Sequence, residues 1–288
     1  MTDNMNIQWY PGHMTKTRRQ IEADLKLVDA VCEIVDARIP VSSRNPDIDA
    51  ICGDKPRMIV LNRMDLADPA ATKKWAECFR RKGMAVIATD CKSKKGISAF
   101  TPAARLACAE KLERDAKRGM NRPLRVMVVG IPNVGKSTLI NQISGRKSAK
   151  AENRPGVTRG KQWVTVDSGL QLLDTPGILW PKFEDPEVGM MLAYTGAVKE
   201  GVIDLEELAY RLMELLHKFY PQTLLERYKV EAPEGTPGWQ LLEMAARKRG
   251  YLVSGGEVNT ERMAKVLLDE FRSGKLGNFT LEMPEDMV

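Results

Sequence analysis

The sequence predicts a doubly wound α/β domain followed by a smaller, all-α domain. Over the first 184 residues, short apolar runs of strand length alternate with longer mixed segments, as in folds whose parallel strands are joined by helices. After Pro181 and Pro186 these runs stop, and apolar residues recur at helical spacing instead. We therefore expect one domain over residues 1–184 and a second one over residues 185–288.

Six apolar runs are the expected strands of the first domain, and most of them are followed by a stretch with helical character. The runs are Ala30–Val35, Met58–Leu61, Ala85–Ala88, Arg125–Val129, Trp163–Val166 and Leu170–Leu173. Ligands of doubly wound folds bind beyond the carboxyl ends of the parallel strands. The residues that follow these runs are therefore the first candidates for a functional site.

Two apolar stripes predict helices in the second domain. The first consists of Leu205, Leu208, Leu212, Leu215, Leu216 and Phe219, and the second of Met263, Leu267 and Phe271. Stripes at this spacing usually face a hydrophobic core, and we interpret both as core rather than as a ligand site. A Ser254-Gly255-Gly256 turn separates the last two expected helices.

The composition is that of a globular protein. Hydrophobic residues make up 43% and charged residues 28% of the chain, and no apolar run is long enough to cross a bilayer. No secretory leader is recognised at the N-terminus, so we expect a cytoplasmic protein without a membrane partner.

The five cysteines include no CxxC pair, which argues against a disulfide framework or a zinc site and favours reduced, structural thiols.

Positive charge is concentrated in the expected first domain. The chain has a net charge of +6, but residues 1–184 hold 32 Lys and Arg against 20 Asp and Glu, whereas residues 185–288 hold 12 against 18. The resulting charges of +12 and −6 favour a polyanionic partner for the first domain. An ordinary solvated surface remains the alternative for any single basic cluster.

The strongest chemical signal is GIPNVGKST, the segment Gly130–Thr138, which directly follows the expected strand Arg125–Val129. It fits the phosphate-binding P-loop pattern GxxxxGK(S/T). The backbone N–H groups of such a loop surround phosphate oxygens, Lys136 reaches the β- and γ-phosphates, and Ser137 ligates Mg²⁺. The expected nucleotide contacts in this segment are Asn133, Val134, Gly135, Lys136, Ser137 and Thr138.

The segment Asn62-Arg63-Met64-Asp65 closes the expected strand Met58–Leu61 and is similar to the guanine-recognition motif NKxD. The Asp65 carboxylate can accept hydrogen bonds from guanine N1–H and from the 2-amino group, a donor pair that adenine lacks. We expect Asn62 to tie this loop to the P-loop. Arg63 replaces the usual lysine, and its planar guanidinium can still stack on the base. A four-residue match also fits a strand-ending turn, so the prediction of GTP depends on its combination with the P-loop.

Two segments after the P-loop are expected to hold Mg²⁺ and the γ-phosphate. The sequence Asp174-Thr175-Pro176-Gly177 resembles the DxxG motif, in which Asp174 holds Mg²⁺ through water and the Gly177 N–H meets the γ-phosphate. Between it and the P-loop, Thr158 offers a hydroxyl ligand to the same ion, although a surface loop residue is the alternative.

The motifs stand in a circularly permuted order. Asp90 and Cys91 follow the expected strand Ala85–Ala88 and lie where a backbone N–H should contact guanine O6. The base motif and this O6 loop therefore precede the P-loop, whereas ordinary G proteins begin with the P-loop. In a doubly wound fold such a permutation preserves the site, so the predicted fold class is a circularly permuted P-loop GTPase domain.

The sequence resembles the YlqF/RbgA family of circularly permuted ribosome-assembly GTPases over nearly its whole length. The matching segments are WYPGHM from Trp9, VDARIP from Val35, GIPNVGKSTLIN from Gly130, RPGVT from Arg154, LLDTPGILWPKFED from Leu172, and the C-terminal stretch from Ala246 to Gly277. The resemblance implies binding to the precursor of the large ribosomal subunit late in its assembly, contact with its ribosomal RNA, and GTP hydrolysis that the subunit stimulates.

The resemblance also implies a catalytic residue and a second ion. Ile178 stands where ordinary G proteins often place the glutamine that orients the attacking water. The family's proposed substitute corresponds to His13, whose imidazole can position or deprotonate water near neutral pH; a structural or RNA-contacting histidine is the alternative. Asn133 resembles the P-loop asparagine that binds K⁺ in related GTPases, and its alternative is a hydrogen bond within the loop.

We expect a GTPase that binds the precursor of the large subunit in the GTP state and leaves on hydrolysis, with Mg²⁺ and K⁺ as its ions. Two alternatives stay open: a nucleotide-regulated RNA-binding factor directed at tRNA or the small subunit, and a nucleotide sensor with a protein partner. The oligomeric state is also open, with a monomer expected. Deleting residues 185–288 is expected to weaken subunit binding and to spare GTP binding.

Overall fold

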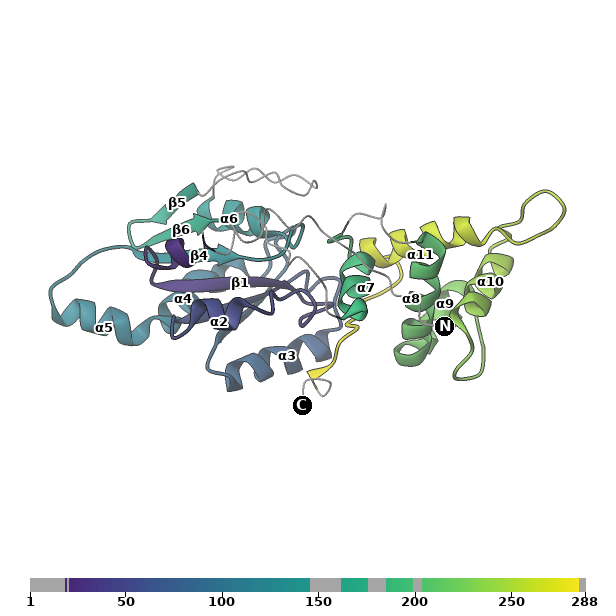
Figure 1. Cartoon of the computed structure of the whole chain (residues 1–288), viewed down its shortest axis with the longest axis horizontal. Coiled ribbons are helices and arrows are strands. Elements are labelled where there is room, and N and C mark those ends of the chain that lie inside the picture. Colours follow the sequence, from purple (N-terminus) through teal and green to yellow (C-terminus); the bar gives the residue numbers. More distant parts are fainter. Residues whose placement is uncertain (1–18, 20, 146–161, 176–184, 199–203, 285–288) are drawn as a thin grey trace.

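The computed structural model describes residues 19, 21–145, 162–175, 185–198 and 204–284. Figure 1 shows an elongated molecule in which a sheet flanked by helices lies beside a group of helices. The strands are β1 (Ala30–Asp36), β2 (Arg57–Asn62), β3 (Ala85–Thr89), β4 (Leu124–Val129), β5 (Gln162–Asp167) and β6 (Leu170–Asp174). The helices are α2 (Ile48–Cys52), α3 (Pro69–Arg81), the short 3-10 helix η1 (Ile97–Ala99), α4 (Phe100–Ala107), α5 (Ala109–Lys117), α6 (Lys136–Ser144), α7 (Pro186–Tyr194), α8 (Leu205–Phe219), α9 (Pro221–Tyr228), α10 (Gly238–Lys248) and α11 (Thr260–Ser273).

The six strands form one sheet in the order β3-β2-β1-β4-β6-β5, and only β5 runs antiparallel to its neighbour. Strands β1 to β3 extend to one side and β4 to β6 to the other, so the winding reverses between β1 and β4. The predicted doubly wound sheet is confirmed. The carboxyl ends of β1 and β4 flank the position where such folds usually bind a ligand.

Each predicted strand is present and extends one or two residues beyond its apolar run. At the carboxyl ends of four of the parallel strands the added residue is polar: Asp36, Asn62, Thr89 and Asp174. These residues remain in the ladder, since Asp36 pairs in register with Asn62 and Asn62 with Thr89. All four are buried. The sheet therefore ends in a row of buried polar groups at the edge where a ligand is expected.

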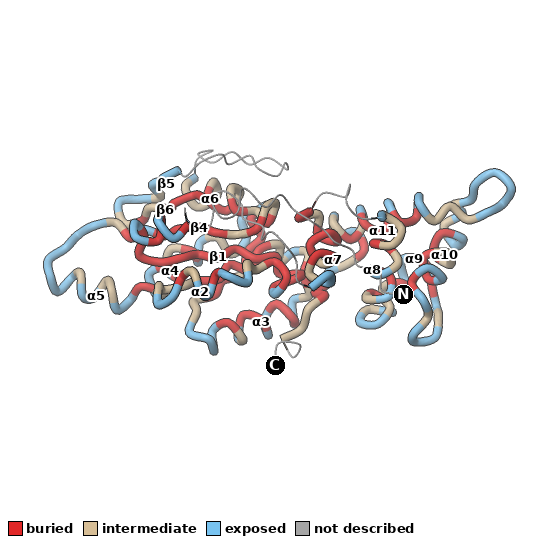
Figure 2. The backbone as a smooth tube through the Cα atoms, in the orientation of Figure 1, coloured by how far each residue is buried: buried red, intermediate tan, exposed pale blue. Residues whose placement is uncertain are grey.

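Helices cover both faces of the sheet, because alternate residues of each strand point to opposite sides. On β1, Ile34 packs in the cluster that includes Leu139 of α6, whereas Val35 packs against Trp75 and Phe79 of α3. Figure 2 shows that the strands other than the edge strand β5 are buried along most of their length. The two layers hold the strand ends, and the loops that follow them, in fixed positions.

Helices α7 to α11 form the helical region, with α8 in contact with each of the other four. The buried positions of the two predicted stripes are Leu208, Leu212, Leu216, Met263, Leu267 and Phe271. Leu205 and Leu215 are only partly buried. The prediction that Phe219 belongs to the core is wrong, since it is 40% exposed. The chain turns after α8, so Tyr220 takes the inner position instead, with its ring centroid 4.9 Å from that of Phe279.

The described residues from 185 onward contain no β-strand, only an isolated bridge between Leu252 and Val258. Gly255 and Gly256 form the predicted turn before α11, with φ values of 96° and 83°. The expected boundary near residue 184 lies outside the described residues, and the division into two domains stays a prediction. No helix in the described part of the chain is long and apolar enough to cross a membrane.

The five cysteines are free, and four of them are buried, in agreement with the prediction of structural thiols. Burial raises the pKa of Cys52, Cys91 and Cys108 to about 11. Thiols of this kind carry little thiolate at neutral pH and are poor nucleophiles.

Candidate functional site

The P-loop joins β4 to α6 and approaches two neighbouring elements closely. Gly135 has a φ of 103°, and a Cβ atom at this position would lie 2.4 Å from Asn62 Nδ2. A Cβ atom at Gly130 would lie 2.6 Å from Ile34 Cγ2 on β1. Both distances are shorter than Cβ contacts in proteins. The loop therefore needs these glycines for close packing and, at Gly135, for its left-handed backbone.

Lys136 and Asp174, which the sequence predicts to bind the phosphates and Mg²⁺, pair with each other in the structure. The Lys136 ammonium lies 2.8 Å from Asp174 Oδ1 and also donates a hydrogen bond to the Thr175 carbonyl. The two side chains are almost fully buried. Thr175 in turn donates through Oγ1 to the Val128 carbonyl at 2.8 Å, which fixes the end of β6 against β4. Ser137 follows Lys136 in the first turn of α6 and is partly exposed.

Asn62 connects three loops through one buried side chain. Its Nδ2 donates to the Val134 carbonyl in the P-loop at 2.7 Å. Its Oδ1 accepts from Thr89 Oγ1 at 3.1 Å and from the Cys91 backbone N–H at 3.2 Å. The base motif, the O6 loop and the P-loop are therefore joined, although Asn62 and Val134 lie 72 residues apart in the chain.

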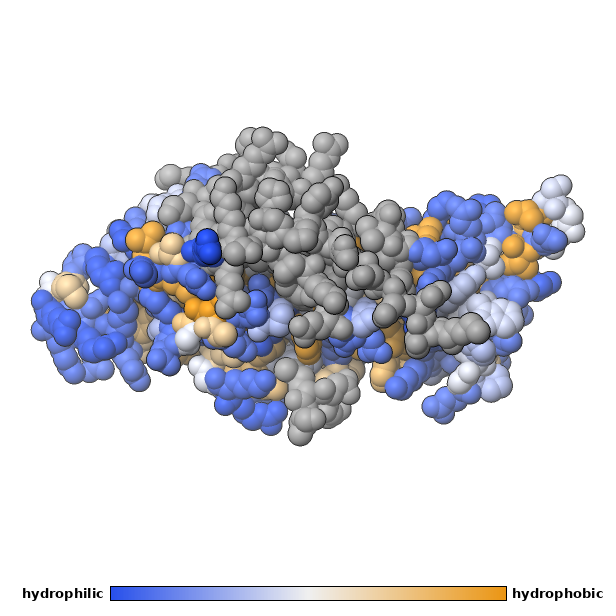
Figure 3. Space-filling view, in the orientation of Figure 1, coloured by the Kyte–Doolittle hydropathy of each residue, from blue (hydrophilic) through white to orange (hydrophobic). Residues whose placement is uncertain are grey.

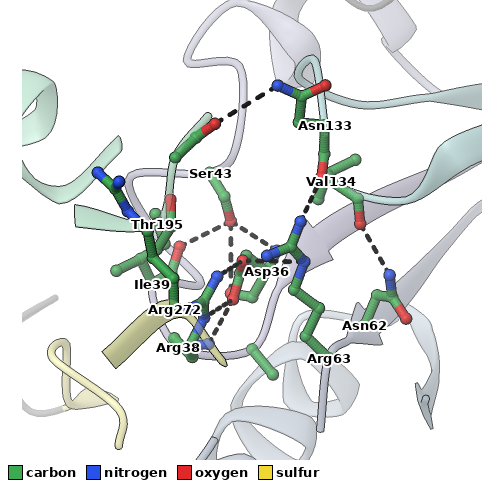
Figure 4. A network of polar contacts seen from close by, with 12 residues as sticks. Asp36, Arg38, Ile39, Ser43, Asn62, Arg63, Asn133, Val134, Thr195 and Arg272 are labelled. Carbon is green, nitrogen blue, oxygen red and sulfur yellow. Dashed lines mark hydrogen bonds and ion pairs between the residues drawn. The ribbon is translucent and has the colours of Figure 1, made fainter. Parts of the chain in front are cut away.

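Arg63 lies across the P-loop, as Figure 4 shows. Its Nη2 donates to the Asn133 carbonyl at 2.6 Å, and its Nε is 3.6 Å from Asp36 Oδ2. Both Arg63 and Asn133 have left-handed backbones, with φ values of 59° and 60°. These contacts hold the guanidinium of Arg63 beside the P-loop, and its stacking on a base stays a prediction.

Asp65 stands exposed in the loop after β2, and Asp90 stands in the neighbouring loop after β3. Desolvation and then the negative charge of Asp90 raise the pKa of Asp65 above its ordinary value. The Asp90 carboxylate accepts hydrogen bonds from the Lys92 and Ser93 backbone N–H groups. Since the Cys91 N–H donates to Asn62, the geometry gives Asp90 and Cys91 a part in holding the O6 loop together. Their contact with a base stays a prediction.

A buried ion pair beside this site was not predicted from the sequence. Arg38 is fully buried, and it forms hydrogen bonds with both oxygens of Asp36 at 3.0 and 2.8 Å. Burial acts to raise the pKa of Asp36, but Arg38, and then Arg63, hold it below its ordinary value. The signal that could have revealed the pair is a carboxylate and a guanidinium two residues apart at the end of the central strand.

The predicted site residues His13, Thr158 and Gly177, together with Ile178, lie outside the described residues. Their predicted roles therefore stay predictions. Within the described residues, the structure brings Asn62, Arg63, Asn133 and Val134 into direct contact, and it pairs Lys136 with Asp174.

Comparison with known proteins gives relatives that match nearly the whole chain. The ribosome biogenesis GTPase A of Priestia megaterium is 45% identical over 285 residues, which is 98% of this chain and 98% of that protein. The chain belongs to the ribosome biogenesis GTPase A family. The corresponding protein of Thermotoga maritima is 34% identical over 98% of this chain. A family model described as 50S ribosome-binding GTPase matches residues 125–220.

Solved structures of this family share the fold. A GDP-bound YlqF has a TM-score of 0.67 at 30% identity, covering 93% of this chain and 100% of that one. A GNP-bound YlqF from T. maritima has a TM-score of 0.62 at 29% identity, covering 94% and 99%. As a family member the chain is a GTPase of ribosome biogenesis, and its GTPase fold is circularly permuted. The predicted resemblance to the YlqF/RbgA family is confirmed.

The residues near the P-loop fit the Mg²⁺ that GTPases of this kind use. Mg²⁺ prefers oxygen ligands and is usually held by one or two protein groups together with phosphates and waters. Asp174 and Ser137 supply such oxygens on adjoining elements, and the buried Asp174 carboxylate already holds a cation, the Lys136 ammonium, at 2.8 Å. The donor set therefore suits a small divalent ion.

Proposed function

We propose that this GTPase binds the precursor of the large ribosomal subunit in its GTP state, late in assembly, and leaves on hydrolysis. The observation that carries the proposal is the hydrogen bond between Asn62 and Val134, which joins the base motif to the P-loop in a chain of the ribosome biogenesis family. The description of the matching family model, 50S ribosome-binding GTPase, supports the large subunit as the partner.

We assign the nucleotide contacts by the chemistry of each group. Asp65 accepts hydrogen bonds from the guanine N1–H and 2-amino groups, and Arg63 covers the base plane. The backbone of the P-loop surrounds the phosphates, and Lys136 turns from Asp174 toward the β- and γ-phosphates. Thr138 continues the phosphate-binding turn, and the Gly177 N–H binds the γ-phosphate.

Two ions complete the proposal. Mg²⁺, held by Ser137 and Thr158 and through water by Asp174, would neutralise the charge that develops on the phosphate oxygens. We propose Asn133 as a ligand of K⁺. The Asn133 amide nitrogen donates to the Gly196 carbonyl at 3.4 Å, so this side chain directs its nitrogen rather than its oxygen toward the protein (Figure 4).

The surface offers basic groups to ribosomal RNA. Figure 3 shows a hydrophilic surface over α5, and Arg114, Lys117 and Arg118 at this helix are exposed. Binding through such groups should weaken steeply with salt, because each phosphate contact releases counterions. We further propose a monomeric, cytoplasmic protein, in keeping with this partner.

Co-sedimentation with purified ribosomal subunits tests the proposal. We expect the chain to travel with the large subunit in the presence of a non-hydrolysable GTP analogue and to remain at the top of the gradient with GDP. Binding to the small subunit or to tRNA would support the RNA-binding factor directed at those partners. Free migration in both nucleotide states would favour a nucleotide sensor with a protein partner.

A further inference from the structure

The chain returns from the helical region to the base motif along its C-terminal strap, residues 275–282. In Figure 1 this yellow segment leaves α11 and runs back to the sheet beside α3. It meets the loop of residues 65–68, which follows β2 and carries Asp65. Two segments more than 200 residues apart in the sequence are thus in direct contact.

The strap forms a hydrogen bond with each residue of this loop. Asn278 Nδ2 donates to the carbonyls of Asp65 at 2.7 Å and Ala67 at 3.2 Å. The Phe279 N–H donates to the Leu66 carbonyl at 2.9 Å. The Asp68 N–H donates to Thr280 Oγ1 at 3.3 Å. A loop between a strand and a helix lacks regular backbone partners, and here the strap supplies them.

The strap is itself firmly held, so it can serve as a template for the loop. Phe279 and Thr280 are each 1% exposed. The Tyr220 hydroxyl donates to the Thr280 carbonyl at 2.9 Å and accepts from its N–H at 3.1 Å. The Leu281 N–H donates to the Arg38 carbonyl at 2.8 Å. The contact with Arg38 lies outside residues 65–68, so the strap has an anchor of its own besides the loop.

We propose that Asn278 is a positioning residue for guanine recognition: by holding the Asp65 and Ala67 carbonyls, it fixes the direction in which the Asp65 side chain leaves the loop. The proposal rests on the proposed function, in which Asp65 reads the base. A carboxylate that accepts two parallel hydrogen bonds depends on its orientation, since hydrogen bonds weaken steeply when misaligned. Loss of the Asn278 contacts should therefore affect discrimination between bases more than phosphate binding.

The test compares GDP with IDP, which lacks the 2-amino group, by titrating the full chain and its Asn278→Ala variant. We expect GDP affinity to fall about fivefold, which is the usual effect of losing one hydrogen bond, here the one between Asp65 and the 2-amino group of the base. The affinity for IDP, which lacks this group, should change little. Asn278→Asp, which turns a carboxylate toward two carbonyls, should lower the preference for GDP further. An unchanged GDP to IDP ratio in both variants, or an equal loss for both nucleotides, would overturn the proposal.

A matched control is Ser42→Ala, which loosens the far end of the strap by removing the Ser42 hydroxyl that donates to the Glu282 carboxylate, and which changes no contact with residues 65–68. We expect this variant to unfold at a lower temperature but to keep the wild-type GDP to IDP ratio. If its ratio falls as far as that of Asn278→Ala, general looseness of the strap explains the effect and the role of Asn278 is refuted.

The Asp65→Asn variant separates failure of this proposal from failure of the proposed function. In the same titration it should shift preference from guanosine to xanthosine diphosphate, because an amide can donate where xanthine carries an oxygen. If Asp65→Asn shifts preference and Asn278→Ala leaves the ratio unchanged, only the role of Asn278 fails. If Asp65→Asn shifts nothing, the assignment of the base motif fails, and the inference fails with it.

Discussion

Asn62 is the side chain at which the loops of the site converge. It can do this because an amide offers both donors and an acceptor, and here they reach Val134, Thr89 and Cys91. A buried polar group left without its partner costs about 1–3 kcal/mol. Asn62 can keep these partners only because Gly135, which lies beside it, has no side chain: a Cβ atom there would lie 2.4 Å from Asn62 Nδ2.

Gly135→Ala should abolish most GTP binding. The added methyl group would lie 2.4 Å from Asn62 Nδ2, so the Asn62 side chain must move away from the P-loop. Gly145→Ala is the matched control, because Gly145 also has a positive φ, 64°, but a Cβ atom at this position would meet no atom within 4 Å. We expect a loss of GTP affinity of at least about tenfold for Gly135→Ala and a change in stability of only about 1 kcal/mol for Gly145→Ala. Equal nucleotide affinity in the two variants would contradict the close contact.

His13→Ala should separate chemistry from nucleotide binding. If His13 positions the attacking water, the variant keeps its GTP affinity but loses about 10²- to 10⁴-fold in subunit-stimulated hydrolysis. Single-turnover hydrolysis with large subunits, beside a nucleotide titration, measures both. The control is His217→Ala, at the only other histidine of the sequence, which lies in α8. Stimulated hydrolysis at the wild-type rate would exclude a catalytic role for His13, and loss of subunit binding alone would make it an RNA contact.

Among the elements, the C-terminal strap connects the helical region to the sheet through several hydrogen bonds. Beyond its contacts with residues 65–68, it ends at Glu282, whose carboxylate accepts from the Val41 and Ser42 N–H groups and the Ser42 hydroxyl. The Glu282 carbonyl accepts from Trp75 Nε1 at 2.8 Å. Desolvation raises the pKa of Glu282 to about 7, although the donors of Val41 and Ser42 act to lower it.

The Glu282 carboxyl should make the stability of the fold depend on pH. Between the ordinary pKa of 4.5 and the folded value of about 7, the folded state binds more protons than the unfolded state, so the free energy of unfolding falls as pH rises through this window. Glu282→Gln removes this contribution. From pH 5 to pH 8 we expect the variant to gain about 2 kcal/mol relative to the wild type, measured by urea unfolding.

The control for this experiment is Glu110→Gln, an exposed position at the start of α5, which removes the same formal charge. The comparison of the two variants isolates the effect of burial at Glu282. A constant difference between Glu282→Gln and the wild type across the pH range would contradict the raised pKa.

The sequence predicted the strands but not where they end. Apolar runs stop at residues such as Val35 and Leu61, whereas the ladder hydrogen bonds continue to Asp36 and Asn62, because pairing needs only the backbone. The strap could not be predicted for a different reason. Its contacts with residues 65–68 depend on tertiary structure alone, and the short segment after Gly274 has neither helical nor strand periodicity.

At the scale of the whole molecule, the described residues show the helical region in contact with the nucleotide site at two places. The strap reaches the base loop through Asn278. The Asn133 amide in the P-loop reaches the Gly196 carbonyl after α7, and Arg272 of α11 donates to the Tyr194 and Ala193 carbonyls of α7 at 3.0 and 2.8 Å. The strap and the Gly196 turn, which make these two contacts, therefore belong to one packed group of elements that consists of α7, α11 and the strap.

Deleting residues 185–288 should consequently lower GTP affinity as well as subunit binding, in contrast to the expectation from the sequence that nucleotide binding is spared. We expect a loss of at least about tenfold, because the base loop loses all its contacts with the strap. A nucleotide titration of the truncated chain measures this. Removal of residues 285–288 alone is the control for a new C-terminus. Wild-type GTP affinity in the longer deletion would show that the helical region does not support the site.

The central claim is that Asp65 and the P-loop form one guanine site, across a permuted chain, whose hydrolysis the large subunit stimulates. Single-turnover hydrolysis of GTP and XTP by Asp65→Asn, with and without large subunits, tests it most directly. The account predicts that the variant loses stimulated GTP hydrolysis and gains stimulated XTP hydrolysis. An unchanged preference for GTP, or XTP hydrolysis that large subunits do not stimulate, would contradict it.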